Sequence, residues 1–449
     1  MVSTSTTTQK PRVIVCGGGL VGLYTAHALS RANIDFVVLE QQSEVTAPKG
    51  AGLVLFPHVA RLLDQLGLYE LALKETITIT DKQMLRQNGR VVLRHRMAQS
   101  IEAQHGYPAL GFPRWKFIRL LYDHLPERET RIRTSARVSD IEMSDDGVRV
   151  HLEDGSVEEG TLVIGADGVY SRVRDAVNRH AQPASATEKA KEKDPSDTSP
   201  MVASFFGIYG IAPYVKGAER TVFNETHGPG MVSQFCAGED EMIFGLYAAL
   251  PKPTTLRHKY TEEELEATAR RWFDVQVFPG IKFKEIWEKC DRSSVHLANA
   301  EEGFIDKWYH GRIVMLGDSV CKMTPIFGMA ANKGIECGAT LVNELYDLFN
   351  SGAEITTASI EKAFQRFQDS QIEDARKIEK RGRVITRLFS WHGWSYWLLD
   401  HLVVPWLNME KITINELTEP VSKAHILDFV PFKGRTGKIP WVRQPKVQA

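Results

Sequence analysis

The sequence predicts an α/β fold in which a parallel, helix-covered sheet is interrupted by a second, mixed β-sheet and followed by a C-terminal helical region. Apolar, β-branched segments at 13–16, 161–164 and 312–316 each run into a glycine-containing turn, with helical periodicity behind it. Segments at 76–104 and 200–250 instead alternate polar and apolar residues, which indicates strands with one solvated face. The last part of the chain has helical periodicity again.

The first apolar strand leads into a turn in which Gly17, Gly19 and Gly22 have the spacing G-x-G-x-x-G. In this pattern the first glycine permits the turn, the second lets backbone approach a pyrophosphate, and the third lets the helix pack on the strand. A second strand at 35–39 ends at Glu40, where a carboxylate can bind ribose hydroxyls. The strand, turn and helix therefore predict a Rossmann-like dinucleotide site, with phosphates at the helix N-terminus.

Composition excludes several classes of protein. The 449 residues are 43% hydrophobic and 25% charged, which suits one large or two ordinary domains with a full core. A formal net charge of -1 argues against a nucleic-acid partner and favours a small neutral or apolar ligand. The five cysteines have no metal-ligand spacing, so we expect no metal site and reduced, intracellular thiols. Residues 1–10 lack the apolar core of a signal peptide and are expected to form a flexible tail.

The middle of the chain supplies further elements in order. Apolar spacing predicts a helix at 58–68, and Asn88-Gly89 between alternating segments predicts a hairpin. Another helix is expected from Arg114, followed by a strand at 148–152. Residues 181–199 contain no large apolar side chain, so we expect a mobile surface loop there.

Two later strands end in acidic residues. The strand at 161–165 runs into Asp167-Gly168, and the strand at 312–316 runs into Gly317-Asp318 with a helix at 332–349 behind it. Because parallel strands of one sheet end at the same edge, these residues are expected beside the same ligand as the glycine turn.

Aromatic residues gather in the second sheet region and near the C-terminus. Those of the sheet are expected to be mostly core, with a few lining an apolar site: Phe205, Phe206, Tyr209, Phe223, Phe235, Phe244 and Tyr247. Residues 388–407 contain four tryptophans, but Asp400 and Pro405 interrupt the apolar run. This favours a buried or interface-lying helix over a membrane span, with peripheral membrane contact as an alternative.

Taken together, these motifs resemble the single-component FAD-dependent monooxygenases of the para-hydroxybenzoate hydroxylase fold, over roughly residues 11–349. The resemblance implies that Glu40 holds the adenosine ribose, Arg114 contacts the middle of FAD, and Asp318 binds ribityl and pyrophosphate oxygens. It also implies that Asp167 and Gly168 serve both FAD and NAD(P)H, the co-substrate.

Several shorter segments resemble the fungal branch that epoxidises prenyl chains in meroterpenoid and indole-diterpene pathways. They are Gly50-Ala51-Gly52, Asp64-Gln65-Leu66-Gly67, Lys322-Met323-Thr324-Pro325 and Leu427-Asp428-Phe429-Val430-Pro431-Phe432. This resemblance implies epoxidation or hydroxylation of an apolar, prenylated metabolite through a flavin hydroperoxide.

The resemblance also implies a domain organisation and a set of cofactor-binding residues. The expected FAD-binding domain comprises 11–75, 105–180 and 300–350, the substrate-binding β-sheet domain 76–104 and 200–299, and the helical, Trp-rich region 351–449. The expected cofactor-binding residues are Gly17, Gly19, Gly22, Glu40, Gly52, Arg114, Asp167, Asp318, Gly328, Ala330 and Ala331. No catalytic side chain is assigned.

One loop departs from the family pattern. Where the family has Gly-Gln-Gly-x-Asn, this chain has Gly328-Met329-Ala330-Ala331-Asn332. A methyl group at Ala330 would crowd the isoalloxazine or change the turn if the position needs a positive φ. The change is either tolerated or alters flavin chemistry, which leaves a non-redox cyclase or isomerase as the alternative function. A binding or scaffold protein is a third reading, against which Glu40, Arg114 and Asp318 argue.

Overall fold

The computed structural model describes residues 10–48, 50–182 and 198–447. Its first sheet has six strands in the order β20-β21-β12-β1-β2-β8, of which β20 alone runs antiparallel to its neighbour. These strands are β1 (Arg12–Cys16), β2 (Asp35–Leu39), β8 (Ile132–Arg133), β12 (Leu162–Gly165), β20 (Tyr309–His310) and β21 (Ile313–Met315). The predicted strands at 13–16, 35–39, 161–165 and 312–316 therefore form the parallel core of one sheet, as the motifs require.

Helices pack against this sheet because their apolar faces are buried with it in one core. They are α1 (Leu20–Arg31), α5 (Arg114–Asp123), α7 (Arg172–Ala181) and α10 (Ala330–Phe349). The smaller neighbours are α2 (Pro57–Gln65), α3 (Tyr69–Glu75), α4 (Met97–His105) and α6 (Arg128–Arg131). The predicted helix at 58–68 ends earlier than expected, because Gly67 has a φ of +76° and the chain turns into α3 there.

The described residues also form two three-stranded sheets. They consist of β3 (Gly52–Leu55), β4 (Ile77–Thr78) and β7 (Leu110–Pro113), and of β9 (Val138–Met143), β10 (Val148–Leu152) and β11 (Val157–Gly160). The pairing of β3 with β7 is antiparallel and places Gly52 opposite Pro113, directly before Arg114.

The second large sheet has eight strands in the order β22-β19-β13-β16-β15-β14-β5-β6. The sheet is mixed, because β5 and β14 pair in parallel whereas all other neighbouring strands of the sheet pair antiparallel. The strands are β5 (Asp81–Arg86), β6 (Val91–His95), β13 (Thr198–Pro213), β14 (Val222–Gly228), β15 (Met231–Ala237), β16 (Glu241–Leu256), β19 (His296–Phe304) and β22 (Cys321–Lys322). The hairpin predicted at Asn88-Gly89 joins β5 to β6 and is confirmed.

One face of this sheet is covered by short elements with their own apolar core. They are α8 (Glu262–Arg270), β17 (Gln276–Phe278), β18 (Ile281–Lys282), α9 (Phe283–Trp287) and the 3-10 turn η3 (Arg292–Ser294). Thr261 is the N-cap of α8 and forms a capping box with Glu264.

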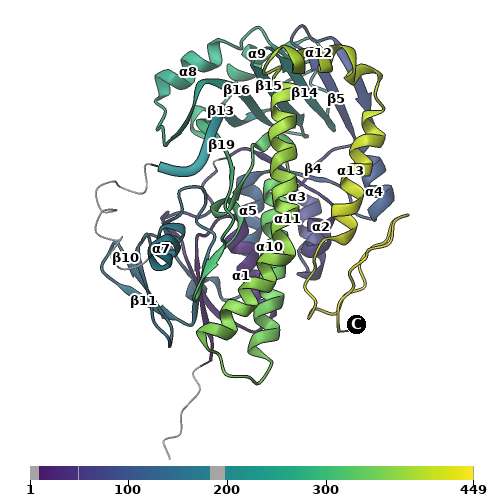
Figure 1. Cartoon of the computed structure of the whole chain (residues 1–449). Coiled ribbons are helices and arrows are strands. Elements are labelled where there is room, and N and C mark those ends of the chain that lie inside the picture. The colour runs from purple at the N-terminus through teal and green to yellow at the C-terminus, as the bar shows by residue number, and fades with distance from the viewer. Residues whose placement is uncertain (1–9, 49, 183–197, 448–449) are drawn as a thin grey trace, which may run out of the picture.

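The C-terminal region begins with α11 (Thr357–Phe389), which at 33 residues is about 50 Å long. It packs on α10 and reaches strands β15 and β19, so it connects the two large sheets (Figure 1). After it come α12 (Trp394–Leu402), the turn η6 (Val404–Trp406) and α13 (Met409–Lys423), which packs on α4 and α2. The predicted α/β fold with an inserted mixed sheet and C-terminal helices is confirmed.

Two segments predicted from the sequence lie mostly outside the described residues. The tail at 1–10 lies outside the described residues apart from Lys10. Most of the loop expected at 181–199 also lies outside them. Of its described residues, Ala181 is the last residue of α7, Gln182 follows it, and 198–199 begin β13.

Candidate active site

The glycine turn between β1 and α1 is fixed by close backbone contacts. Gly17 has a φ of +109°, and a Cβ atom on it would lie 2.4 Å from the carbonyl oxygen of Ala166. A Cβ atom on Gly22 would lie 1.9 Å from the carbonyl oxygen of Gly17. Both positions therefore exclude every side chain.

Gly19 differs from these two glycines. A Cβ atom on it would have Arg114 Nη2 as its nearest neighbour, at 3.8 Å, so the backbone there is open to its surroundings. Gly19 is also the N-cap of α1, and no described side chain caps that helix. The unpaired N–H groups of its first turn are available to an anion such as a pyrophosphate.

Glu40 follows β2 and is held by backbone groups. Its Oε2 accepts a hydrogen bond from the N–H of Gly18 at 2.7 Å, and its Oε1 accepts one from the N–H of Gln42 at 2.7 Å. A carboxylate has about four acceptor sites, so each oxygen can still accept a bond from a ribose hydroxyl.

A cavity of about 540 Å³ lies beside these elements. Seven of the eleven predicted cofactor-binding residues line it: Gly19, Gly52, Arg114, Asp318, Gly328, Ala330 and Ala331. Gly17, Gly22, Glu40 and Asp167 lie outside its lining, although Gly168 belongs to it. Four different strand ends and the start of α10 thus converge on one space.

Asp318 lies in the turn η4 (Gly317–Ser319), directly after β21, and its carboxylate Oδ2 is 2.5 Å from Lys322 Nζ. Burial on its own lowers the pKa of Lys322, but the charge and hydrogen bond of Asp318 outweigh it, so the pKa of Lys322 is raised. The ammonium group therefore remains charged at neutral pH. The pairing of Lys322 with Asp318 is not among the sequence predictions, although the i, i+4 spacing of the two residues is a signal for it.

Asp167 has a different role from Asp318. Its Oδ1 accepts a hydrogen bond from Ser171 Oγ at 2.6 Å, and its Oδ2 accepts one from the N–H of Val173 at 3.1 Å. Burial raises the pKa of Asp167 even though these bonds lower it. The carboxylate thus fixes the turn before α7 and, through that turn, the position of Gly168 at the cavity wall.

The loop before α10 carries the departure from the family pattern. The turn η5 (Pro325–Phe327) ends at Gly328, which has a φ of +71°. Ala330 is already the first residue of α10 and helical, so its methyl group strains no turn, contrary to one of the effects considered above. Met329 is the N-cap of α10, and no described side chain caps that helix. Its first N–H groups are therefore free to face negative charge in the cavity.

Asn332 holds this loop in place. Its Oδ1 accepts a hydrogen bond from the N–H of Phe56 at 2.7 Å, and its Nδ2 donates to the carbonyl oxygens of Val54 and Gly328 at 2.9 Å each. The side chain is completely buried. The asparagine of the family pattern therefore connects the start of α10 to β3.

The opposite wall of the cavity comes from the eight-stranded sheet. Four of the seven sheet aromatics line it, as expected for a few of them: Tyr209, Phe223, Phe244 and Tyr247. The rings of Tyr209 and Tyr247 meet edge to face at 5.4 Å between centroids. One wall thus carries charges and helix N-termini, whereas the other combines aromatic rings with a few polar side chains, among them Lys82, Gln234 and Asn299.

Comparison with known proteins agrees with this arrangement. Residues 10–359 match the family described as FAD binding domain. The chain is 39% identical to the FAD-dependent monooxygenase srdH of Neurospora crassa, over 96% of this chain and 99% of that protein. It is 31% identical to the FAD-dependent monooxygenase paxM of Penicillium paxilli, over 95% and 88% of the two chains. The crystal structure of Klebsiella pneumoniae HpxO with FAD and uric acid has a TM-score of 0.74 at 19% identity, over 92% and 96% of the chains.

The chain therefore belongs to the FAD binding domain family, and its class is that of the FAD-dependent monooxygenases. The expected cofactor, FAD, and the expected fold are confirmed.

Proposed function

We propose that the protein uses FAD and NAD(P)H to add one oxygen atom to an apolar, prenylated metabolite, by epoxidation or hydroxylation. The observation that carries this proposal is the cavity of about 540 Å³, in which a wall with cofactor-binding motifs faces an aromatic wall from the eight-stranded sheet. Pockets for one drug-sized molecule typically have about 300 to 1,000 Å³. We also keep the predicted domain division as a proposal, with β19 crossing its boundary at residue 300.

The residues present fit FAD. The open backbone at Gly19 suits the pyrophosphate, and Arg114 points toward the same position. Asp318 offers carboxylate oxygens to ribityl hydroxyls, and Glu40 offers them to the ribose. The N-terminus of α10 suits the negative charge of a reduced isoalloxazine. These assignments are proposals for each residue.

When bound and reduced, FAD would supply the activation of molecular oxygen. The chain supplies position and environment. Tyr209, Phe244 and Tyr247 hold an apolar substrate against the cofactor side of the cavity and exclude water from it. Lys322 fixes the carboxylate of Asp318 in position, because its Nζ is 2.5 Å from Asp318 Oδ2.

Turnover with and without oxygen tests this function. The FAD-loaded protein is incubated with a panel of farnesyl-substituted aromatic compounds, with NADH or NADPH and ¹⁸O₂, and the masses of the products are measured by mass spectrometry. We expect products that carry one ¹⁸O atom, and none when nicotinamide or oxygen is left out. Conversion of a substrate without both would overturn the proposal and establish a non-redox cyclase or isomerase.

We further propose peripheral membrane contact through residues 388–407. Trp394 and Trp406 are 79% and 87% exposed, and Leu402 is 60% exposed, whereas Asp400 is completely buried. Tryptophan prefers the membrane–water interface, so the exposed side chains of α12 and η6 suit that position. Within residues 10–48, 50–182 and 198–447 we find no helix of sufficient length and apolarity to cross a membrane.

A further inference from the structure

A second cavity, of about 460 Å³, lies between the β5–β6 edge of the sheet and the helices α11 and α13. Its lining is mainly apolar and includes Leu93, Met329, Ile385, Leu388, Ile412 and Leu417. Its volume is again that of a site for one small molecule.

The second cavity adjoins the first. Five residues line both of them: Phe56, Lys82, Met97, Ile326 and Phe327. The two spaces therefore lie on either side of the same five residues, so a molecule that extended past these residues would reach from the first cavity into the second. The first cavity must also hold the reactive part of the cofactor, which leaves the second for the remainder of a large substrate.

Met329 supports this reading. Its side chain is 3% exposed and lines the second cavity, whereas Ala330 and Ala331 line the first. A glutamine at residue 329, as in the family pattern, would place an amide in apolar surroundings, where an unpaired polar group is costly. Methionine instead offers a flexible apolar surface. The departure from the family pattern thus makes the second cavity more apolar.

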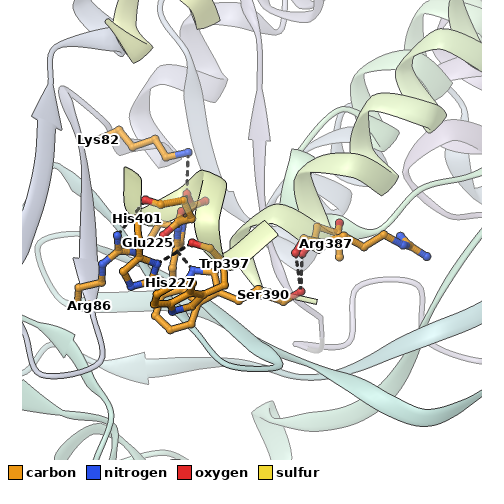
Figure 2. Close-up of polar contacts among 11 residues, drawn as sticks. Lys82, Arg86, Glu225, His227, Arg387, Ser390, Trp397 and His401 are labelled. Atoms are coloured by element: carbon orange, nitrogen blue, oxygen red, sulfur yellow. Dashed lines mark hydrogen bonds and ion pairs between the residues drawn. The ribbon is translucent and has the colours of Figure 1, made fainter. Parts of the chain in front are cut away.

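Lys82 stands at the junction and belongs to a buried network of charges (Figure 2). Its Nζ is 3.1 Å from Glu225 Oε1, and the same oxygen is 3.0 Å from His227 Nε2. His227 Nδ1 is 2.9 Å from Asp400 Oδ1, and Asp400 is also paired with Arg86. The network thus connects β5 and β14 of the sheet to α12.

The histidine of this network is charged. Both of its ring nitrogens face carboxylate oxygens, and only an imidazolium has a donor on each nitrogen. Burial on its own lowers the pKa of His227, but hydrogen bonds to Asp400 and Glu225 outweigh it, so the pKa is raised. Lys82, Arg86 and His227 then oppose two carboxylates, which leaves the network with one positive charge in excess.

Lys82 is the member of this network that opens to both cavities, and its side chain is 23% exposed. The neighbouring carboxylate of Asp81 is paired with Arg94 on the adjacent strand, which is itself paired with Glu219. An ammonium group has three donors, so one bond to Glu225 leaves others for a ligand. A ligand oxygen at the junction would meet this donor.

We propose that the second cavity binds the hydrocarbon body of the substrate and that Lys82 donates a hydrogen bond to a substrate oxygen at the junction. The substrate class is then an extended, apolar molecule with a hydroxyl or carbonyl group part of the way along it. This inference deepens the proposed function and rests on it, because the ligand of the second cavity is a substrate only if the protein is the proposed monooxygenase.

Binding of two probes tests the cavity. Farnesol is an apolar chain with a hydroxyl group, and farnesene has the same carbon number without it. Binding to the FAD-loaded protein is measured by equilibrium dialysis without nicotinamide, so no turnover occurs. Ile412→Trp fills the cavity, and Ile414→Trp on the same helix is the control, because Ile414 is equally half-buried but lies outside the lining.

We expect Ile412→Trp to weaken binding of both probes at least tenfold and Ile414→Trp to leave it within twofold. Equal binding by Ile412→Trp and the wild type, or no farnesol binding by the wild type up to the solubility limit, would overturn the proposal. Since the assay uses oxidised protein, a failed oxygenation assay would refute the proposed function and leave this result unaffected.

Substitution of Lys82 tests the polar contact. Lys82→Met should weaken farnesol binding about tenfold, as expected for a lost bond to a charged donor, and leave farnesene binding unchanged. Lys82→Arg should retain farnesol binding. If Lys82→Met does not fold, the double variant Lys82→Met/Glu225→Gln removes both members of the ion pair and gives the same comparison. Equal effects on the two probes, or none on farnesol, would overturn the role of Lys82.

Discussion

The two walls of the first cavity are built in different ways. On the nucleotide-binding side, several contacts follow the strands of one parallel sheet, as with Gly19 after β1 and Asp318 after β21. On the other side, residues from β5, β13, β14, β15, β16 and β19 contribute, and a buried charge network fixes β5 and β14 to α12. The first wall is determined by local backbone geometry, whereas the second depends on distant side chains meeting in the fold. Substitutions in the two walls should therefore have different effects on stability, on pH dependence and on cofactor binding.

The largest effect is expected in the glycine turn. In Gly22→Ala the new Cβ atom would lie 1.9 Å from the carbonyl oxygen of Gly17. Because that oxygen belongs to the backbone, the clash can be relieved only by a costly shift of the turn. We expect a loss of more than about 4 kcal/mol in the free energy of unfolding, or no soluble protein. Gly19→Ala is the matched control, since its Cβ atom would make only an ordinary contact with Arg114 Nη2 at 3.8 Å, and should cost no more than about 1 kcal/mol. Urea denaturation measures both; equal losses would contradict the assigned roles.

The charge network should give the next largest effect. His227→Gln removes the hydrogen bonds of the imidazolium to buried Glu225 and Asp400, which should cost about 1.5 to 3 kcal/mol in the free energy of unfolding. Lys82 and Arg86 face the same carboxylates and remain.

The same network predicts a pH dependence. Because the folded pKa of His227 is raised above its ordinary value of 6.5, its contribution is complete below pH 6.5 and is lost as pH rises through the raised pKa. The pKa of Glu225 is lowered to about 2: burial raises it, but Lys82 and His227 outweigh burial. Its contribution is therefore present above pH 4.5 and lost as pH falls toward 2. Urea midpoints across pH should fall at the alkaline end in the wild type but not in His227→Gln; identical profiles would refute the imidazolium.

Asp318 should affect the cofactor more than the fold. Asp318→Ala removes hydrogen-bond acceptors and leaves Lys322 without its partner, so FAD affinity should fall by about 1.5 to 3 kcal/mol, or roughly tenfold to 150-fold. The purified variant should lose its yellow colour. Asp306→Ala is the control, because Asp306 is an exposed partner of Arg376. Unchanged FAD content in Asp318→Ala would contradict the assignment.

The smallest effect on stability is expected at the exposed tryptophans. Trp394→Ser combined with Trp406→Ser should change the free energy of unfolding by about 0.5 kcal/mol or less, because both side chains are exposed. If residues 388–407 lie on a membrane, the variant should shift from the liposome pellet to the supernatant. Trp391 is kept, since its Nε1 donates to Asp400 at 2.9 Å. An unchanged pellet fraction would exclude membrane contact through these tryptophans.

This difference between the walls also explains what the sequence could reveal. The strands around the glycine turn and the convergence of Gly19, Gly168 and Asp318 follow from local motifs and the rule for parallel strand ends. Arg114 follows β7 of a separate antiparallel sheet, so its place beside Gly19 was expected from the family resemblance alone. The hairpin at Asn88-Gly89 was likewise recognisable from its turn residues.

The second cavity and the charge network were not recognisable in this way. Lys82, His227 and Asp400 are far apart in the sequence, and each belongs to a segment whose pattern indicates only strand or helix. The parallel pairing of β5 with β14 places Lys82 near Glu225, and alternation along a strand gives no signal for such a pairing. The tryptophans of residues 388–407 indicated burial or an interface, and only the fold distinguishes exposed Trp394 from Trp391.

A crystal structure of the protein with FAD tests the central claim most directly, namely that one cavity joins a cofactor wall to a substrate wall. We predict the pyrophosphate at the backbone of Gly19 and the guanidinium of Arg114, ribityl hydroxyls at Asp318, and the isoalloxazine between the N-terminus of α10 and Tyr247. An isoalloxazine seated among Ile385, Ile412 and Leu417 instead would contradict both the assignment of the first cavity to the cofactor and that of the second to the substrate.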